Sequence, residues 1–253
     1  MNSDAILTAL DLPASSRVDQ RVPKKLLLEH GAPTAADKRH INEGIEELLW
    51  VAALKPTTIG VPEYRDDERE YLEIAVLRLS VRGPGKATRL VELVHRAIPY
   101  PVLLLTEHGA QSGLSGAHKR WSLGEAGKTV LEGEVIAVEL DAAVRDADCW
   151  AAFRDALALG RQPRATLYAL YQGWLDTLVA LHAARVTGTF AVAGNTEQAS
   201  ARRDALRECA RLDGEIVRLR AAAAKEKQMR RQVELNLELK RIEAQLATAR
   251  ERL

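Results

Sequence analysis

The sequence predicts an α+β protein: a mixed β-sheet body with flanking helices, followed by a long C-terminal α-helical coiled-coil tail. Three observations support this prediction. Segments with strand-like alternation and segments with helical periodicity follow one another up to about residue 190. The last proline is Pro163 and the last aromatic residue is Phe190. Beyond that point the apolar residues recur in heptads, which is typical of paired helices.

The composition is that of an ordinary globular chain. Of the 253 residues, 47% are hydrophobic and 28% are charged, which argues against wholesale disorder. Lys and Arg total 36 against 35 Asp and Glu, so the chain as a whole has no strong attraction for nucleic acid. No apolar run approaches the roughly 18 residues of a membrane span, and the N-terminus lacks a signal-peptide pattern. We therefore expect a cytoplasmic protein with no membrane partner.

The first regular elements follow a proline-rich start. Thr34 is a good N-cap for a helix over residues 35–54, because apolar residues recur there at helical spacing. Pro56 ends this helix, and residues 57–61 resemble a short strand. A charged, exposed connector follows.

The clearest strand of the chain spans residues 71–81. Its apolar alternation changes phase near Leu77, which indicates a bulge or burial on both faces. An amphipathic helix is expected over residues 86–97, and a Pro-Tyr-Pro break leads into a buried strand at 102–105.

The later part of the body turns from strands to helices. Residues 114–121 and 129–140 are strand-like, whereas 146–159 and 166–186 are helical. The second helix carries a wide apolar face, so it should be buried. The predicted domains are a body over residues 1–190 and a helical tail over residues 197–253.

The tail contains two heptad series separated by a phase slip. The apolar positions are Cys209, Leu212, Ile216, Leu219 and Ala223, then Leu235, Leu239, Ile242, Leu246, Ala249 and Leu253. The slip indicates a stutter or a break between two short coils. A narrow apolar stripe must pack on something, so we predict a partner interface through the leucines and isoleucines of both series. The interface residues are Leu212, Ile216, Leu219, Leu235, Leu239, Ile242 and Leu246. The stripe could fold back on the body, self-associate or dock onto another protein.

The tail is more basic than the body. Residues 197–253 carry 14 Lys and Arg against 10 Asp and Glu. Lys227, Arg230 and Arg231 are the candidate nucleic-acid contacts, since they cluster between the two heptad series. Interleaved acids and the absence of aromatic residues favour a solvated helical surface instead.

No motif specifies a reaction. The segment 122–129 ends like a phosphate-binding loop, but Ser122 stands where its first glycine should be. Glu73 lies on a strand as in a metal nuclease, yet Ala75 occupies the position of the required lysine. Ser115 lacks the spacing of a nucleophile elbow. We therefore predict no catalytic residue, no metal ligand and no cofactor.

Several motifs resemble one bacterial family. These are Val22-Pro23-Lys24-Lys25, Leu49-Trp50, the strand Tyr71-Leu72-Glu73-Ile74, the segment Ala97-Ile98-Pro99-Tyr100-Pro101-Val102 and Lys119-Arg120-Trp121. Together they resemble the domain-of-unknown-function family 4391 over most of residues 10–190. The family-matched residues are Pro23, Lys24, Lys25, Trp50, Glu73, Pro99, Tyr100, Pro101 and Trp121.

The resemblance implies a genetic context rather than a chemistry. Members of the family tend to be encoded beside helicases and DNA methyltransferases in restriction-type or phage-defence clusters. We therefore expect a non-catalytic accessory or adaptor protein of such a system, forming a homo-oligomer or a hetero-complex through its tail. A helicase or a DNA methyltransferase is the candidate partner. The alternatives are a metal-dependent nuclease subunit using the acids of residues 63–73, and a DNA-binding protein.

Overall fold

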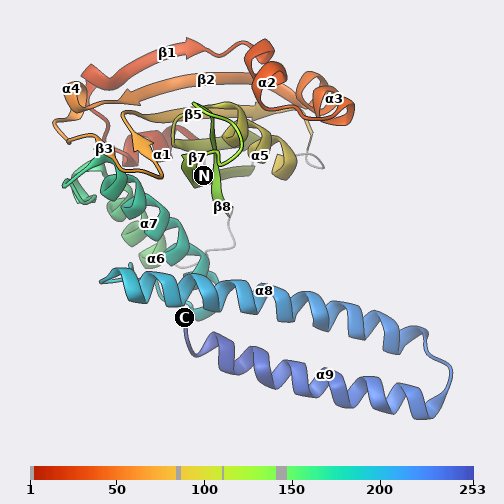
Figure 1. The fold of residues 1–253 in the computed structure, drawn as a ribbon. Helices are drawn as coiled ribbons and strands as arrows, with labels where there is room; N and C mark the ends of the chain where they lie inside the picture. The colour runs from red at the N-terminus through yellow and green to blue at the C-terminus, as the bar shows by residue number, and fades with distance from the viewer. Residues whose placement is uncertain (1–2, 84–86, 110, 141–146) are drawn as a thin grey trace. The chain divides into compact units, whose positions relative to one another are not determined.

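The computed structural model describes residues 3–83, 87–109, 111–140 and 147–253. By its internal packing the chain divides into two compact units, Met1–Leu178 and Val179–Leu253. The first unit contains the β-sheet, and the second contains a helical hairpin (Figure 1). The predicted starts of two helices, at residues 86 and 146, lie outside the described residues. In the part of the chain that is described, no helix is long and apolar enough to cross a membrane.

A six-stranded mixed sheet forms the centre of the first unit, in the order β1-β2-β5-β6-β7-β8. Its strands are β1 (Arg17–Arg21), β2 (Ile45–Leu54), β5 (Ile74–Val81), β6 (Val102–His108), β7 (Gln111–Trp121) and β8 (Thr129–Glu139). β5 and β6 run parallel and are joined by helix α5 (Ala87–Ala97), whereas every other neighbouring pair is antiparallel. A separate ribbon pairs β3 (Tyr64–Arg65) with β4 (Glu70–Tyr71). The expected α+β class with a mixed sheet is confirmed.

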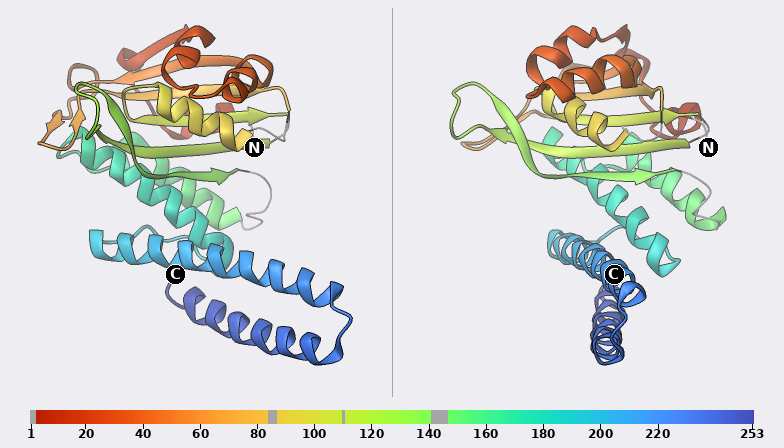
Figure 2. Two further views of the ribbon diagram at one scale, coloured as in Figure 1. Left: turned by 45° about the vertical axis from the view of Figure 1, so that its right-hand side comes forward. Right: turned by 90° about the vertical axis from the view of Figure 1, so that its right-hand side faces the viewer.

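Helices cover both faces of the sheet (Figure 2). α2 (Lys24–His30), α3 (Ala35–Gly44) and α5 share one hydrophobic core with the strands. α1 (Ser3–Ala9), α6 (Ala147–Leu157) and the first part of α7 (Leu167–Thr187) lie on the other face. Short helical turns occur at α4 (Pro56–Ile59), Ala14–Ser16 and Leu159–Arg161.

The phase change predicted in the clearest strand reflects burial on both faces. Ala75, Leu77 and Leu79 of β5 belong to the core shared with α2, α3 and α5. Ile74 and Val76 point to the opposite face and are equally buried. A central strand covered by helices on both sides has no solvent face, so strict polar alternation is not required.

The predicted helix over residues 35–54 is wrong in its second half. Thr34 caps α3 as expected, since its hydroxyl accepts the backbone N–H of Asp37 at 3.1 Å. The helix ends at Gly44, however, and the chain continues as strand β2. Apolar residues from Ile45 onward suit either a buried helix or a central strand, and pairing with β1 and β5 decided between them.

The predicted strand over residues 57–61 is also wrong, because the helical turn α4 occupies this segment. Pro56 is the first residue of this helical turn. The N–H groups at a helix start have no acceptor within the helix, so a proline, which lacks an N–H, is tolerated there. The Thr58 hydroxyl accepts the backbone N–H of Lys55 at 2.9 Å, and Gly60 ends the turn with a φ of 65°. These local bonds outweigh the β-branched composition of the segment.

The second unit contains the end of α7 and a hairpin of two helices, α8 (Thr196–Lys225) and α9 (Met229–Arg250). Within the described residues, this hairpin stands in place of the long coiled coil that the heptads predicted. The chain leaves the helical conformation at residues 226–228, where the two heptad series change phase. The helices run antiparallel (Figure 1), and Arg220 pairs with Glu243 at 2.8 Å across them. The phase slip is therefore a break that lets the two halves of the tail pair with each other.

Candidate functional site

The two apolar stripes of the tail face each other inside the hairpin. Cys209, Leu212 and Ile216 of α8 form one cluster with Ile242, Leu246 and Ala249 of α9, and Leu219, Leu239 and Leu253 pack against it. Six of the seven predicted interface residues thus meet within one chain. Leu235, the seventh, is partly buried outside this cluster. Whether these residues also contact a partner stays a prediction.

Apolar side chains remain on the outside of the hairpin. Met229, Val233 and Leu237 recur every four residues on α9 and are 74%, 51% and 63% exposed. Val217 of α8 is exposed as well. Residues four apart lie on the same side of a helix, so the three α9 side chains form an apolar row in solvent. We call Met229, Val233 and Leu237 the α9 row.

The candidate nucleic-acid contacts lie at the turn end of the hairpin. Arg230 and Arg231 both pair with Glu234, at 3.5 Å and 3.0 Å. Lys227 lies in the connection between the helices. Glu234 offsets only one of these two positive charges, so the turn keeps a small net positive charge. Strong binding of a phosphate backbone needs more uncompensated cations than this.

Lys24 binds the C-terminal end of α3, and its family-matched neighbours Pro23 and Lys25 lie at the start of α2. The Lys24 ammonium donates to the carbonyl oxygens of Asn42 at 3.0 Å and Ile45 at 2.5 Å, just where α3 ends. A cation is favourable there, since helix C-termini carry partial negative charge. Burial lowers the pKa of Lys24, and two nearby arginines add to this effect. Pro23 precedes α2, and Lys25 pairs on the surface with Glu29.

The Ile-Pro-Tyr-Pro segment connects α5 to the sheet. The carbonyl of Pro99 accepts the hydroxyl of Thr129 at 3.0 Å, and that of Pro101 accepts a backbone N–H of Ala75 at 2.9 Å. The Tyr100 ring lies beside the Trp50 ring of β2, with centroids 6.2 Å apart. This family motif therefore lies where α5, β5, β2 and the start of β8 meet.

The acids proposed for a nuclease serve local structure. Asp66 accepts the backbone N–H groups of Glu68 and Arg69 at 2.8 Å and 2.7 Å, which closes the β3–β4 turn. Glu73 is buried and pairs with Lys55 at 3.1 Å. Among the described residues, no group of three or more His, Cys, Asp or Glu could hold a metal ion.

A partly buried polar network around His118 was missed by sequence reasoning. The Tyr71 hydroxyl lies 2.6 Å from His118 Nδ1, and Gln172 Oε1 lies 2.7 Å from Nε2. Gln172 in turn donates to Asp176 at 2.8 Å, which orients its amide. The imidazole therefore carries its hydrogen on Nε2 and accepts the Tyr71 hydroxyl on Nδ1. Burial raises the pKa of Tyr71.

The same network extends to Arg69 through an aromatic ring. Tyr168 stacks on His118 with centroids 4.9 Å apart, and its hydroxyl accepts Arg69 at 3.2 Å. Arg69 also pairs with Glu132 of β8 at 3.2 Å. The backbone N–H of the family-matched Trp121 donates to the β3–β4 turn at 2.7 Å. Apart from Gln172 and Asp176, which lie on the same helix, the bonded partners are 47 to 99 residues apart in the chain, so only folding brings them together. Their contacts link the β3–β4 ribbon, β7, β8 and α7.

The opposite face of β7 carries Ser115 and Lys119 against α5. His95 Nε2 lies 2.9 Å from the Ser115 hydroxyl, and both residues are buried. Burial and the nearby Lys119 lower the pKa of His95 to about 3. Such an imidazole is a poor general base near neutral pH, so this pair is not poised to make Ser115 a nucleophile.

Lys119 is a buried amine at the end of α5. Its ammonium donates to the carbonyl oxygens of His95 and, at 2.7 Å, of Ile98. Burial lowers the pKa of Lys119 to about 7. These two carbonyl groups at the C-terminus of α5 accept hydrogen bonds from the buried amine in place of water.

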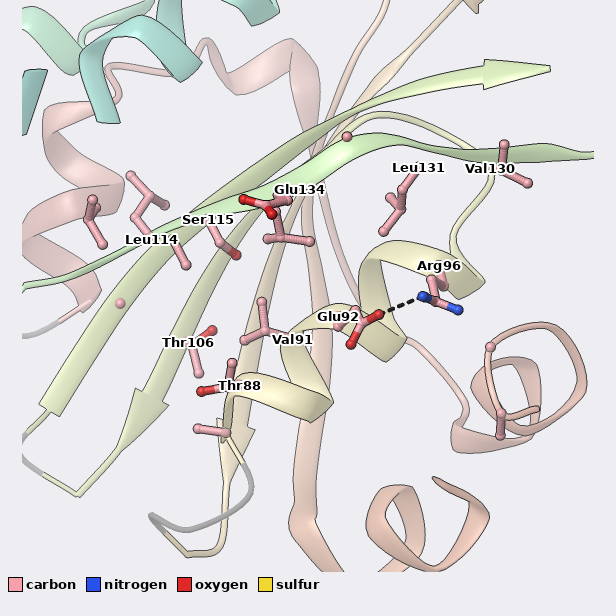
Figure 3. Close-up of a pocket in the computed structure, with 18 of the residues that line it drawn as sticks. Thr88, Val91, Glu92, Arg96, Thr106, Leu114, Ser115, Val130, Leu131 and Glu134 are labelled. Atoms are coloured by element: carbon pink, nitrogen blue, oxygen red, sulfur yellow. Dashed lines mark ion pairs between the residues drawn. The ribbon is translucent and has the colours of Figure 1, made fainter. Parts of the chain in front are cut away.

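One large pocket lies between α5 and the β7–β8 hairpin (Figure 3). Its volume is about 1060 Å³. Thr88, Val91, Glu92 and Arg96 line the pocket from α5, and Ser115 lines it from β7. Ligand-binding clefts commonly have volumes of roughly 300–1,000 Å³ and a mainly apolar lining with a few polar groups.

Comparison with known proteins gives a family match. The family model described as domain of unknown function (DUF4391) matches residues 10–246. No curated protein matches the sequence, and no solved structure matches the fold. The family model covers nearly the whole chain, so the chain belongs to the DUF4391 family.

Proposed function

We propose that this chain is a non-catalytic accessory protein of a restriction-modification or phage-defence system, and that the α9 row binds an enzyme subunit of that system. The observation that carries the proposal is the exposure of Met229, Val233 and Leu237 on one side of α9. Solvent-exposed apolar rows on a helix are typical of binding faces for a partner groove.

The hairpin supplies this row on a support that is already folded. The seam between α8 and α9 buries Leu212 and Ile242 without help from another chain. Little ordering entropy remains to be lost on binding, which favours affinity. A helicase or a DNA methyltransferase encoded beside the gene is the proposed partner, as the family context suggests.

Co-expression tests the proposal. The full chain is produced with the neighbouring helicase and methyltransferase, and complexes are purified and their masses measured by light scattering. Val233→Glu combined with Leu237→Glu should abolish the complex, because two charges would have to be desolvated in an apolar groove.

The matched control adds two charges to α9 without removing an apolar side chain. Asn236→Glu combined with Gln245→Glu should leave the complex intact, since both positions are exposed outside the α9 row. The proposal fails if the complex survives the first double variant, or if no complex with either enzyme forms.

A further inference from the structure

The wall of the pocket formed by β8 is shaped by a bulge. Between the pairs Gly116–Ile136 and His118–Glu132, β7 has one residue and β8 has three. Gly133 adopts a φ of 76°, which a side chain would strain. Bulges redirect side chains and are frequent beside binding sites. Here the bulge includes Glu134, an exposed residue that lines the pocket.

The arginine and the lysine of the lining, Arg96 and Lys128, are already paired. Arg96 binds Glu92 at 2.6 Å, an ion pair drawn in Figure 3, and Lys128 binds Glu125 at 2.9 Å. Glu134 has no ion pair or hydrogen bond to any described residue. The lining also contains Glu29, which pairs with Lys25, and Glu139. The carboxylate of Glu134 is therefore a charge that the pocket can offer to a ligand.

The remaining lining combines aliphatic side chains with hydroxyl groups and other polar groups. Val91, Leu114, Leu131 and Val135 give the pocket aliphatic surface from α5, β7 and β8. Ser115 is 2% exposed, and its hydroxyl is held by His95. This combination of aliphatic walls and an unpaired carboxylate suits a ligand with an apolar body and a positive end.

We propose that the pocket binds an organic cation, in which an aliphatic chain contacts α5 and β8 and an ammonium or guanidinium group pairs with Glu134. Anionic ligands are disfavoured, because Arg96 and Lys128 are neutralised by their own partners. This site lies within the first unit and is separate from the α9 row, so it goes beyond the function proposed above.

Isothermal titration of the full chain with agmatine tests the proposal. Agmatine is an aliphatic chain with a guanidinium group at one end and an ammonium group at the other. Glu134→Gln should weaken its binding about tenfold, since a charge-assisted pair becomes a neutral contact. 1,6-Hexanediol, which has no charge, should bind at least about tenfold more weakly than agmatine.

Glu46→Gln is the control, because Glu46 is an exposed carboxylate on β2 outside the pocket. It should leave agmatine binding unchanged. The proposal is overturned if agmatine does not bind, if Glu134→Gln binds it as well as the unaltered chain, or if hexanediol binds equally well. None of these results would affect the assembly predicted for the α9 row.

Discussion

The sheet unit and the helical hairpin bury their apolar residues in different ways. In the sheet unit, strands such as β5 are covered on both faces, and the core joins segments far apart in the chain. In the hairpin, a single seam joins α8 to α9, and Val217 and the α9 row stay in solvent. The comparison shows that the sheet unit buries its apolar strands on both faces, whereas the hairpin leaves apolar side chains exposed beside its seam.

The largest expected effect comes from placing a charge in each core. Leu77→Asp should unfold the sheet unit and Leu212→Asp should unfold the hairpin, each costing at least about 3 kcal/mol, because both leucines are fully buried. All four tryptophans lie within residues 1–178. Tryptophan fluorescence therefore reports the sheet unit, while far-ultraviolet circular dichroism also reports the hairpin.

Leu212→Asp should lower the helical signal and leave the fluorescence unchanged. Val217→Asp, at an exposed position of the same helix, is the control and should change neither. A fluorescence change in Leu212→Asp would show that the two units unfold together.

Replacing a glycine by alanine should lower the free energy of unfolding in the sheet unit and raise it in the hairpin. A Cβ on Gly116 would lie 2.6 Å from Leu175 Cδ2 and 2.9 Å from the Tyr171 hydroxyl oxygen, so Gly116→Ala should destabilise by about 2 kcal/mol. Gly214 lies within α8 with open space around it, so Gly214→Ala should stabilise the hairpin by about 0.5–1 kcal/mol. Urea titrations of both variants measure these changes. If both variants changed the free energy of unfolding in the same direction, the contrast between the tightly packed sheet unit and the open surface of the hairpin would be contradicted.

Lys119 should make the stability of the sheet unit depend on pH. The folded chain releases the Lys119 proton near pH 7, whereas the unfolded chain holds it up to the ordinary lysine pKa of 10.5. Between these values the unfolded state binds more protons, so the free energy of unfolding rises with pH by at most about 1.4 kcal/mol per pH unit. Below pH 7 both states are protonated and this contribution is constant.

Lys119→Met removes the titrating group and should abolish that rise. Urea titrations of the unaltered chain and of Lys119→Met at pH 7, 8 and 9 give the slope of the free energy of unfolding against pH for each protein. All other titrating groups are the same in both proteins, so the difference between the slopes reports Lys119. Parallel slopes would show that the Lys119 pKa is not lowered by folding.

The smallest expected effects are those of the helix caps. Thr34 caps α3 in the sheet unit, and Asn195 caps α8 in the hairpin by accepting the N–H of Gln198 at 2.8 Å. Replacing either by Ala should cost about 1 kcal/mol. Thr34→Ala should shift the fluorescence transition and Asn195→Ala only the helical transition. Coincident shifts in either variant would argue against separate units.

Local signals in the sequence were sufficient for several elements. Thr34 marked a helix start, the alternation around Leu77 marked a buried strand, and the Pro-Tyr-Pro break separated α5 from β6. These signals act within a few residues, through caps, strand alternation and the fixed φ of proline. The buried positions of the tail were likewise readable from their spacing.

Long-range packing decided the rest. Residues 45–54 became β2 because β1 and β5 pair with them, and His118 meets Tyr71 and Gln172 only through folding.

By itself, the sequence determined the α+β class, the family, and the positions of the apolar stripes, because periodicity and motifs are properties of neighbouring residues. Only the tertiary structure decided that the two stripes face each other, that a row on α9 stays exposed, and that Glu134 lines a pocket beside α5. These are contacts and exposures between distant segments, and no local pattern encodes them.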